Sequence, residues 1–198
     1  RGRNPSLRIF RLSLLAALAA AAPGCSGAGP KLYPLSDRAV LLEVPVIRQD
    51  QLYDCGMAAV SALCAYHAVE PGAEASAALA ARAEASHGLS GGEVREFLEA
   101  QGFEVLLFRG MPDHGETGAL RHLDAGRPLL VMLSFDQGAL FHYCLLVGYD
   151  PGMDTVYLLD PRRGLVLLPT RQFDQFWQPA ARFSLLALPQ GSSMARME

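Results

Sequence analysis

The feature that most constrains the fold is a change of character along the chain. Segments in the first part are alanine-rich or amphipathic without internal proline, whereas the second part consists of short apolar runs bounded by Gly, Pro and Asp. The first pattern is typical of helices and the second of strands. We expect helices at 55–67, 73–85, 91–100 and 117–125, and strands at 41–47, 104–108, 129–134, 141–149, 156–160, 165–169 and 183–188. Helices followed by mostly sequential strands predict an α+β fold, with N-terminal helices packed on an antiparallel sheet.

The segment 91–100 carries the clearest helix signals. Ser90 is a suitable N-cap, and Gly102 stands where a glycine commonly ends a helix. The apolar residues Val94, Phe97 and Leu98 recur at spacings of three and four. This spacing predicts one buried face.

The N-terminus has the pattern of an export signal. Residues 1–11 hold four Arg and no acidic residue, and residues 12–22 form an apolar run broken only by Ser13. The run is shorter than the roughly 20 residues of a membrane-spanning helix, but it suits the apolar region of a signal peptide. We therefore expect residues 1–24 to be a signal peptide, with a buried alanine-rich helix as the alternative.

Cys25 follows the apolar run after small residues, which resembles a bacterial lipoprotein signal with Cys25 as the lipidated residue. Ordinary signal-peptide cleavage near 20–22 is the competing interpretation. Residues 25–40 are expected to be a tether, residues 41–190 the folded domain and residues 191–198 a C-terminal tail. The predicted location is the cell envelope, on the periplasmic face, with membrane attachment through a lipid anchor only.

The charge distribution argues against nucleic acid as a partner. Four of the 17 basic residues lie in residues 1–24, which leaves 13 basic against 20 acidic residues in the remainder. An acidic body of this kind lacks the positive surface that phosphate backbones require. No glycine-rich phosphate loop followed by Lys is present either, and no cofactor is expected.

Cys55 is the first candidate for chemistry. It stands in the first turn of an expected helix and is followed by Gly56. A helix N-terminus presents unpaired N–H groups and a partial positive charge, which favour thiolate over thiol. A buried structural cysteine is the alternative.

His142 and Asp160 are the candidates for a base and its orienting acid. His142 lies in an apolar strand, and Asp160 ends the next strand 18 residues later, so a hairpin can place them side by side. A carboxylate on one imidazole nitrogen fixes the tautomer and leaves the other nitrogen for a thiol. A satisfied core histidine and a turn aspartate are the alternatives.

Gln49 lies six residues before Cys55 and is the candidate for oxyanion stabilisation. Its side-chain amide can donate to the oxyanion that forms when a thiolate attacks a carbonyl, with the Cys55 backbone N–H as the second donor. Gln51 competes for this role, and either residue can instead be an ordinary polar loop residue.

These motifs together resemble the C39 family of bacteriocin-processing cysteine peptidases. The segments that carry the resemblance are QDQLYDCGMA at 49–58, HY at 142–143, GYD at 148–150 and LDP at 159–161. The resemblance covers roughly residues 41–188 and implies a papain-like cysteine peptidase fold. It implies that Cys55 is the nucleophile, His142 the general base and acid, Asp160 the orienting residue and Gln49 the oxyanion-hole side chain.

The family resemblance also bears on substrate and partners. Many members cut leader peptides after two glycines and are fused to an exporter, but this chain has no exporter segment. We therefore expect an exported peptidase that hydrolyses a secreted or envelope peptide or protein through a Cys55 thioester. A separate secretion system is a candidate partner. The alternatives are a silent peptide-docking domain and a thioester-forming acyltransferase.

The remaining cysteines, aromatic residues and histidines have simpler interpretations. Cys144 shares a strand face with His142, and Cys64 lies nine residues after Cys55. A Cys64–Cys144 disulfide and two buried free thiols both remain open. No metal site is expected, because no Cys/His pair has the usual zinc-ligand spacing.

Three aromatic residues at helical spacing predict core packing, with a substrate patch as the minor alternative. Four histidines are expected at the surface. The aromatic residues are Phe173, Phe176 and Trp177, and the histidines are His67, His87, His114 and His122.

Overall fold

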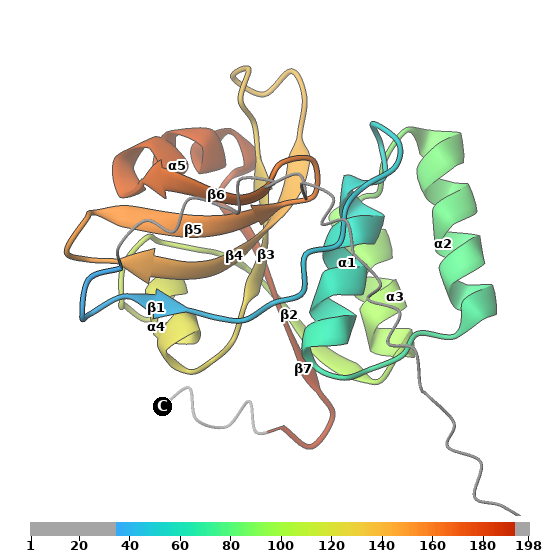
Figure 1. Cartoon of the computed structure of the whole chain (residues 1–198). Helices are drawn as coiled ribbons and strands as arrows, with labels where there is room; N and C mark the ends of the chain where they lie inside the picture. The colour runs from blue at the N-terminus through green and yellow to red at the C-terminus, as the bar shows by residue number, and fades with distance from the viewer. Residues whose placement is uncertain (1–34, 193–198) are drawn as a thin grey trace, which may run out of the picture. The chain divides into compact units, whose positions relative to one another are not determined.

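The computed structural model of the chain describes residues 35–192. A seven-stranded antiparallel sheet forms its centre, with helices against both faces (Figure 1). The sheet order is β2-β7-β3-β4-β5-β6, and β1 pairs with β4 beside β3. The strands are β1 Val40–Leu41, β2 Phe103–Arg109, β3 Leu129–Leu133, β4 His142–Asp150, β5 Thr155–Asp160, β6 Gly164–Pro169 and β7 Phe183–Pro189. This arrangement confirms the predicted α+β class.

Helices α1 (Cys55–Tyr66) and α3 (Gly91–Ala100) cover one face of the sheet, and α2 (Ala73–Ser86) packs on these two helices on the side away from the sheet. Helix α1 packs on β4, and its small residues allow a close approach. At Gly56 an added Cβ would lie 3.2 Å from Leu89 Cδ1 and 3.3 Å from Tyr143 Cδ2. Glycine after Cys55 therefore lets the start of α1 press against β4 and the segment before α3.

Helix α3 begins and ends where the sequence predicts. The Ser90 hydroxyl accepts from the Glu93 backbone N–H at 3.2 Å, and the Glu93 carboxylate accepts from the Ser90 N–H at 2.8 Å. This capping box satisfies two N–H groups at the start of the helix. Gly102 adopts a φ of +85° just past the C-cap, a conformation that favours glycine.

The opposite face of the sheet is covered by α4 (Ala119–Asp124), α5 (Thr170–Trp177) and a 3₁₀ turn, η1 (Gln178–Ala180). Phe173 and Trp177 are fully buried there, and the Trp177 indole donates to the Phe183 carbonyl at 2.9 Å. Core packing is thus the role of these two rings, as the sequence predicts. Phe176 is half-buried and contacts the Phe135 ring, with centroids 4.8 Å apart.

Two predictions from the sequence are wrong in detail. The expected strand at 41–47 pairs only at Val40–Leu41, because Pro45 has no N–H to donate and the Val44 N–H bonds to the Leu42 carbonyl. His122 was expected at the surface but is 2% exposed, with its ring 5.4 Å from that of Phe108. Its place on the inner side of the short helix α4 explains the burial. His67 is half-buried, whereas His87 and His114 are exposed.

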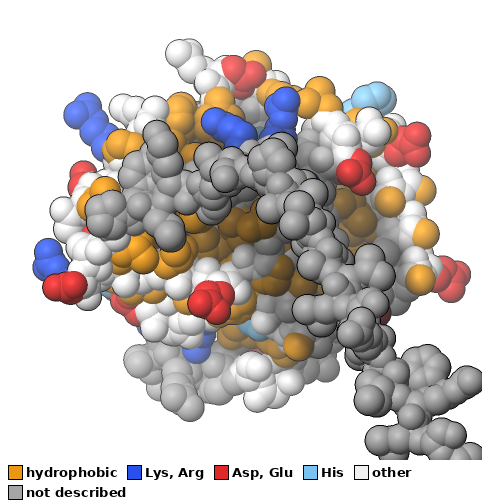
Figure 2. Space-filling view, in the orientation of Figure 1, with side chains coloured by type: hydrophobic (Ala, Val, Ile, Leu, Met, Phe, Trp, Pro, Cys, Tyr) orange, Lys and Arg blue, Asp and Glu red, His pale blue; other side chains and the backbone are white. Residues whose placement is uncertain are grey.

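Some of the predictions from the sequence concern residues outside the described range. They are the signal peptide, the lipidation of Cys25, the tether up to residue 34 and the tail beyond residue 192. Among residues 35–192, none of the helices has the length and apolar character needed to cross a bilayer. On the face drawn in Figure 2, basic and acidic side chains are scattered around exposed apolar ones.

Candidate active site

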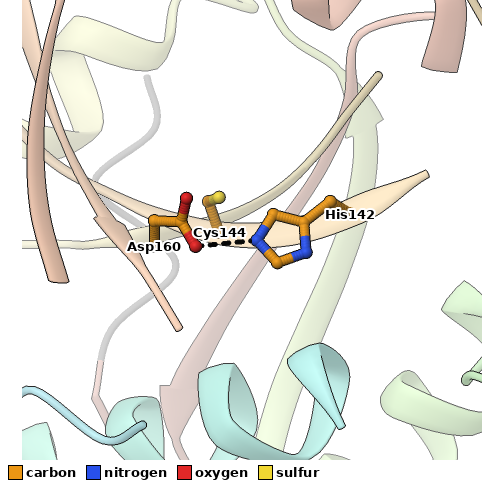
Figure 3. A group of neighbouring side chains, drawn as sticks. All are labelled: His142, Cys144 and Asp160. Atoms are coloured by element: carbon orange, nitrogen blue, oxygen red, sulfur yellow. Dashed lines mark hydrogen bonds and ion pairs between the residues drawn. The ribbon is translucent and has the colours of Figure 1, made fainter. Parts of the chain in front are cut away.

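Cys55, His142 and Asp160 meet at one end of the sheet although they come from three elements. Cys55 is the first residue of α1, His142 the first residue of β4, and Asp160 the last residue of β5. The antiparallel pairing of β4 with β5 brings His142 Nε2 to 2.9 Å from Asp160 Oδ1 (Figure 3). The hairpin predicted from the sequence therefore does place the imidazole beside the carboxylate.

Asp160 is a fully partnered buried carboxylate. Oδ1 accepts from the Arg162 backbone N–H at 2.8 Å and from His142, and Oδ2 accepts from Arg163 Nε at 2.8 Å. Burial by itself raises the pKa of the Asp160 carboxyl, but these hydrogen bonds outweigh it and hold the pKa well below its usual range. Asp160 is therefore a fixed negative charge beside the imidazole.

His142 is held in its charged form by its neighbours. Burial alone lowers the pKa of the imidazole, yet hydrogen bonds to Asp160, Cys144 and Cys55 outweigh it and raise the pKa well above the ordinary value. Because Nε2 faces Asp160, Nδ1 is the ring nitrogen left for the Cys55 sulfur. This orientation suits proton exchange between thiol and imidazole.

The Cys55 thiol has the surroundings of a nucleophile. Burial raises the pKa of this thiol, but the hydrogen bonds with His142 and with the backbone N–H groups of Tyr143 and Gly56 outweigh burial, so the net pKa is lowered. The other two described cysteines differ. Burial raises the pKa of Cys64 to about 11, and it raises the pKa of Cys144 as well.

Cys64 and Cys144 are both buried free thiols, and they belong to different core clusters on the two faces of the sheet. The structure therefore contains no disulfide between them. Of the two alternatives left open by the sequence, free thiols are the arrangement found.

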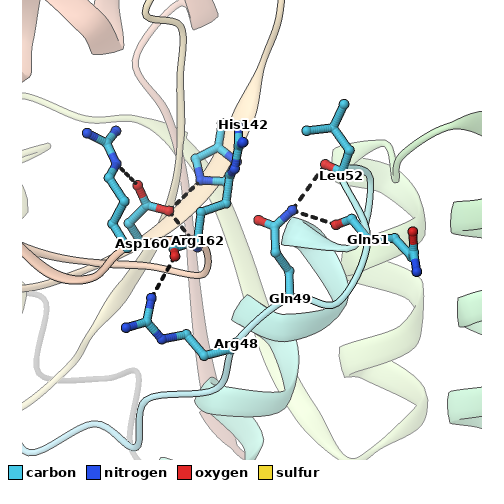
Figure 4. A network of polar contacts seen from close by, with 8 residues as sticks. Arg48, Gln49, Gln51, Leu52, His142, Asp160 and Arg162 are labelled. Atoms are coloured by element: carbon cyan, nitrogen blue, oxygen red, sulfur yellow. Dashed lines mark hydrogen bonds and ion pairs between the residues drawn. The ribbon is translucent and has the colours of Figure 1, made fainter.

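Gln49 lies beside His142, but its amide faces the loop before α1 (Figure 4). Nε2 donates to the backbone carbonyls of Gln51 at 2.6 Å and Leu52 at 3.2 Å, while Oε1 is buried without a hydrogen-bond partner. Both amide hydrogens are thus engaged within the loop that precedes α1. The Gln49 amide must leave these carbonyls before it can donate to an oxyanion.

The backbone beside Gln49 is fastened to the turn after Asp160. The Gln49 N–H donates to the Pro161 carbonyl at 3.1 Å, and Arg48 Nη1 donates to the Arg162 carbonyl at 2.6 Å (Figure 4). These bonds tie the loop before α1 to the strand end that carries the carboxylate. They fix the position of α1 relative to the His142–Asp160 pair.

A cleft of about 1140 Å³ opens over Cys55 and His142. Its walls are largely apolar. Its acidic lining residues are Glu93, Asp136 and Asp160, and its basic ones are Arg162 and Arg163 beside His142. The apolar walls come from the loop before α1, the segment before α3 and the loop between β3 and β4. They include Leu52, Tyr53, Leu89, Phe135, Leu140 and Phe141. Leu52 and Leu140 are 65% and 59% exposed, so they can make apolar contacts with a bound chain.

Several residues of this site were missed by sequence reasoning. Arg163 lies with its guanidinium carbon 5.2 Å from the centre of the Phe135 ring, and that ring is 6.3 Å from the His142 ring. Arg163 and Phe135 therefore cover the His142–Asp160 pair. The Arg–Arg sequence after Asp160–Pro161 was the available signal for Arg163. Nothing in the sequence connects Phe135 with the His142–Asp160 pair, because the contact of Phe135 depends on how the β3–β4 loop folds back.

The comparisons with known proteins agree with this geometry. The model of the Peptidase_C39 like family matches residues 41–184. Among solved structures, the chain is similar to a double glycine motif protease from an AMS/PCAT transporter in complex with the leader peptide. The identity is 20% and the TM-score 0.57, over 79% of this chain and 98% of that one.

Two further structures share the fold. The peptidase domain of Streptococcus ComA, a bi-functional ABC transporter involved in a quorum sensing pathway, has 19% identity and a TM-score of 0.56, over 73% of this chain and 97% of that one. A Bacillus anthracis protein described as C39-like has 15% identity and a TM-score of 0.56, over 78% of this chain and 99% of that one. The search of curated proteins found no match. Because the family model matches well over half of the chain, this protein belongs to the Peptidase_C39 like family, and its fold is that of the papain-like C39 peptidase domains.

Proposed function

We propose that this protein is a cysteine peptidase that hydrolyses a peptide bond through a thioester on Cys55. The observation that carries the proposal is that the Cys55 thiol and the Asp160 carboxylate both contact the His142 imidazole. The pKa of the thiol is lowered and the pKa of the imidazole is raised. A thiolate–imidazolium pair requires a lowered thiol pKa together with a raised imidazole pKa.

In the first half of the proposed reaction, the Cys55 thiolate attacks the substrate carbonyl carbon. The oxyanion is held by the Cys55 backbone N–H at the start of α1 and by Gln49 Nε2, once that amide has left the loop carbonyls. The His142 imidazolium then gives its Nδ1 proton to the leaving amine. The products of this half are a free amine and a thioester on Cys55.

In the second half, neutral His142 takes a proton from water, and the hydroxide attacks the thioester carbonyl. The thiolate leaves, the acid product departs, and the imidazolium is restored. Asp160 keeps Nε2 protonated and the ring oriented throughout. Each turnover therefore consumes one water molecule and returns the site to its starting state.

The proposed substrate is a peptide or an unfolded protein segment. The cleft has exposed apolar side chains at its mouth, such as Leu52, Leu140 and Phe141, which favour a chain with apolar residues near the cleavage point. The solved relative that is in complex with a leader peptide supports a peptide ligand. With the export signal expected from the sequence, we propose a secreted or envelope substrate and a lipid-anchored location in the cell envelope.

A peptide library with mass-spectrometric product analysis tests the proposal. The Cys55→Ala variant should lose turnover while keeping the wild-type melting temperature within a few degrees, and Cys64→Ala, which removes a buried thiol away from the cleft, should keep turnover. Residual turnover of Cys55→Ala within tenfold of wild type contradicts the thioester mechanism. Product carrying an added amine instead of water identifies an acyltransferase, and binding without any product identifies a docking domain.

A further inference from the structure

Behind His142 lies a group of side chains that the peptidase mechanism uses only in part. A ring nitrogen of His142, the Sγ of Cys144 and a carboxylate oxygen of Asp160 all lie within 4.8 Å of one another (Figure 3). Cys144 is 1% exposed and helps to hold the imidazole in its charged form, but no step of the thioester chemistry on Cys55 uses its sulfur. The group joins a Cys and a His two apart on β4 with an Asp from β5, so it lacks the usual zinc-ligand spacing along the sequence and was not predicted as a metal site.

The three donor atoms match the chemistry of a thiophilic divalent cation. Thiolate, imidazole and carboxylate are the three side-chain groups that bind Zn²⁺. With bond lengths of about 2.0–2.3 Å, the ligands of a tetrahedral zinc ion are about 3.3–3.6 Å apart. The Nε2–Oδ1 distance of 2.9 Å would have to open by about half an ångström, and the group as a whole already lies within 4.8 Å.

The partners of Asp160 leave it able to turn toward an ion. Arg163 Nε holds Oδ2 at 2.8 Å, and the Arg162 N–H donates to Oδ1, the oxygen that also faces His142. A carboxylate oxygen has more than one lone pair, so Oδ1 can keep the Arg162 bond while it binds a cation. His142 and Asp160 both line the cleft, which gives the ion a path of entry.

We propose that His142, Cys144 and Asp160 bind a Zn²⁺ or Cd²⁺ ion that switches the peptidase off. Binding forms bonds from the ion to Nε2, Sγ and a carboxylate oxygen, with water in the fourth position. The Nε2 proton of the imidazolium and the Cys144 thiol proton leave to solvent, which offsets the two charges of the ion. No oxidant or reductant takes part.

The inhibitory consequence rests on the proposed function, whereas the binding site itself does not. With an ion on Nε2, the imidazole keeps its Nδ1 proton but loses the hydrogen bond to Asp160 and becomes a poor proton donor to the leaving amine. Turnover stops. The Cys55 sulfur carries no metal bond and still accepts a hydrogen bond from the retained Nδ1 proton, so it still reacts with an alkylating reagent.

Cadmium titration of the full chain tests the site without any assay of activity. In a Cys55→Ala background, a sulfur-to-cadmium ultraviolet band should appear with one ion per chain. Cys144→Ala and Cys144→Val should remove it, while Cys64→Ala and Cys25→Ala should keep it. Circular dichroism melting shows that each variant is folded. No band in the parent, or a band that survives both Cys144 substitutions, overturns the site.

A second arm tests the consequence in the chain with Cys55 intact. Zn²⁺ should suppress peptide turnover at least tenfold while the iodoacetamide reaction of Cys55 falls less than threefold. Cys144→Ala should keep in Zn²⁺ the turnover that the same variant has without the ion. Loss of Cys55 alkylation, unchanged by Cys144→Ala, places the ion on Cys55 and contradicts the proposal. If the chain cleaves no peptide at all, the peptidase proposal fails, and the cadmium band still decides whether the site exists.

Discussion

At the scale of single residues, His142 is the residue on which the proposed chemistry depends. Its Nε2 contacts a carboxylate that is itself fixed by Arg162 and Arg163, and its other nitrogen is left for Cys55. The sequence showed a histidine in an apolar strand, and a buried ring of that kind needs a polar partner. The only signal for Arg163 was the pair of arginines after Pro161, and its contact with the carboxylate depends on the turn after Asp160.

Replacing Asp160 with Asn separates charge from orientation. The Asn oxygen can still accept from Nε2 and from the Arg162 N–H, but the negative charge that raises the pKa of His142 is lost. We expect NMR titration of His142 in Asp160→Asn to give a pKa at least one unit lower than in the wild type. The alkaline limb of the rate profile should move to lower pH by the same amount.

Asp136→Asn is the matched control, because Asp136 also lines the cleft but bonds to Ser134 and Leu140 instead of His142. It should leave the His142 titration unchanged. An unshifted titration in Asp160→Asn would mean that Asp160 does not set the charge state of the imidazole.

At the scale of elements, sequence patterns located the helices and most strands to within a residue or two. They succeeded where local signals are strong, as in α3 with its Ser90–Glu93 capping box. They failed at 41–47, where β-forming residues lie in a segment that leaves the sheet after Leu42, whose N–H donates to the Val147 carbonyl, and crosses to the helices. That path is set by long-range bonds, such as Gln49 N–H to the Pro161 carbonyl, which no local pattern encodes.

The loop that holds Gln49 gives a prediction at this scale. The Gln49 amide bonds to the carbonyls of Gln51 and Leu52, so Gln49→Ala removes both the proposed oxyanion donor and two hydrogen bonds within the loop. We expect kcat/KM to fall by about 10²–10³, with the alkylation pKa of Cys55 unchanged. Gln51→Ala is the control, because the bonds of Gln51 in this loop come from its backbone, and it should change the rate less than threefold. Equal losses in the two variants would assign the effect to the loop and not to the Gln49 amide.

At the scale of the whole molecule, two buried groups make the unfolding free energy depend on pH in the acid range. Burial lowers the pKa of His122 to about 4, and the charges of Arg121 and Arg127 contribute. Between about pH 6.5 and 4, His122 therefore binds a proton in the unfolded chain but not in the folded one. Stability therefore falls as the pH drops through this window. The lowered pKa of Asp160 adds stability that is complete above about pH 4 and is lost at still lower pH.

Urea unfolding from pH 7 to pH 4 tests the His122 contribution. The wild type should lose about 2–3 kcal/mol more of its unfolding free energy over this range than His122→Asn, which carries no titrating ring. The His87→Asn variant, which changes an exposed histidine, should follow the wild-type slope. Parallel slopes in wild type and His122→Asn would show that the buried ring is not the source of the acid sensitivity.

The most direct test of the catalytic pair is the alkylation rate of each cysteine against pH, followed by mass spectrometry. We predict that Cys55 reacts as a thiolate well below pH 8 and loses this reactivity in His142→Ala, while Cys64, whose pKa is raised to about 11, stays unreactive. Titration of Cys55 near the value of about 8.5 for a free thiol, or the same rate in His142→Ala, would contradict the account and leave a docking domain as the better description of this chain.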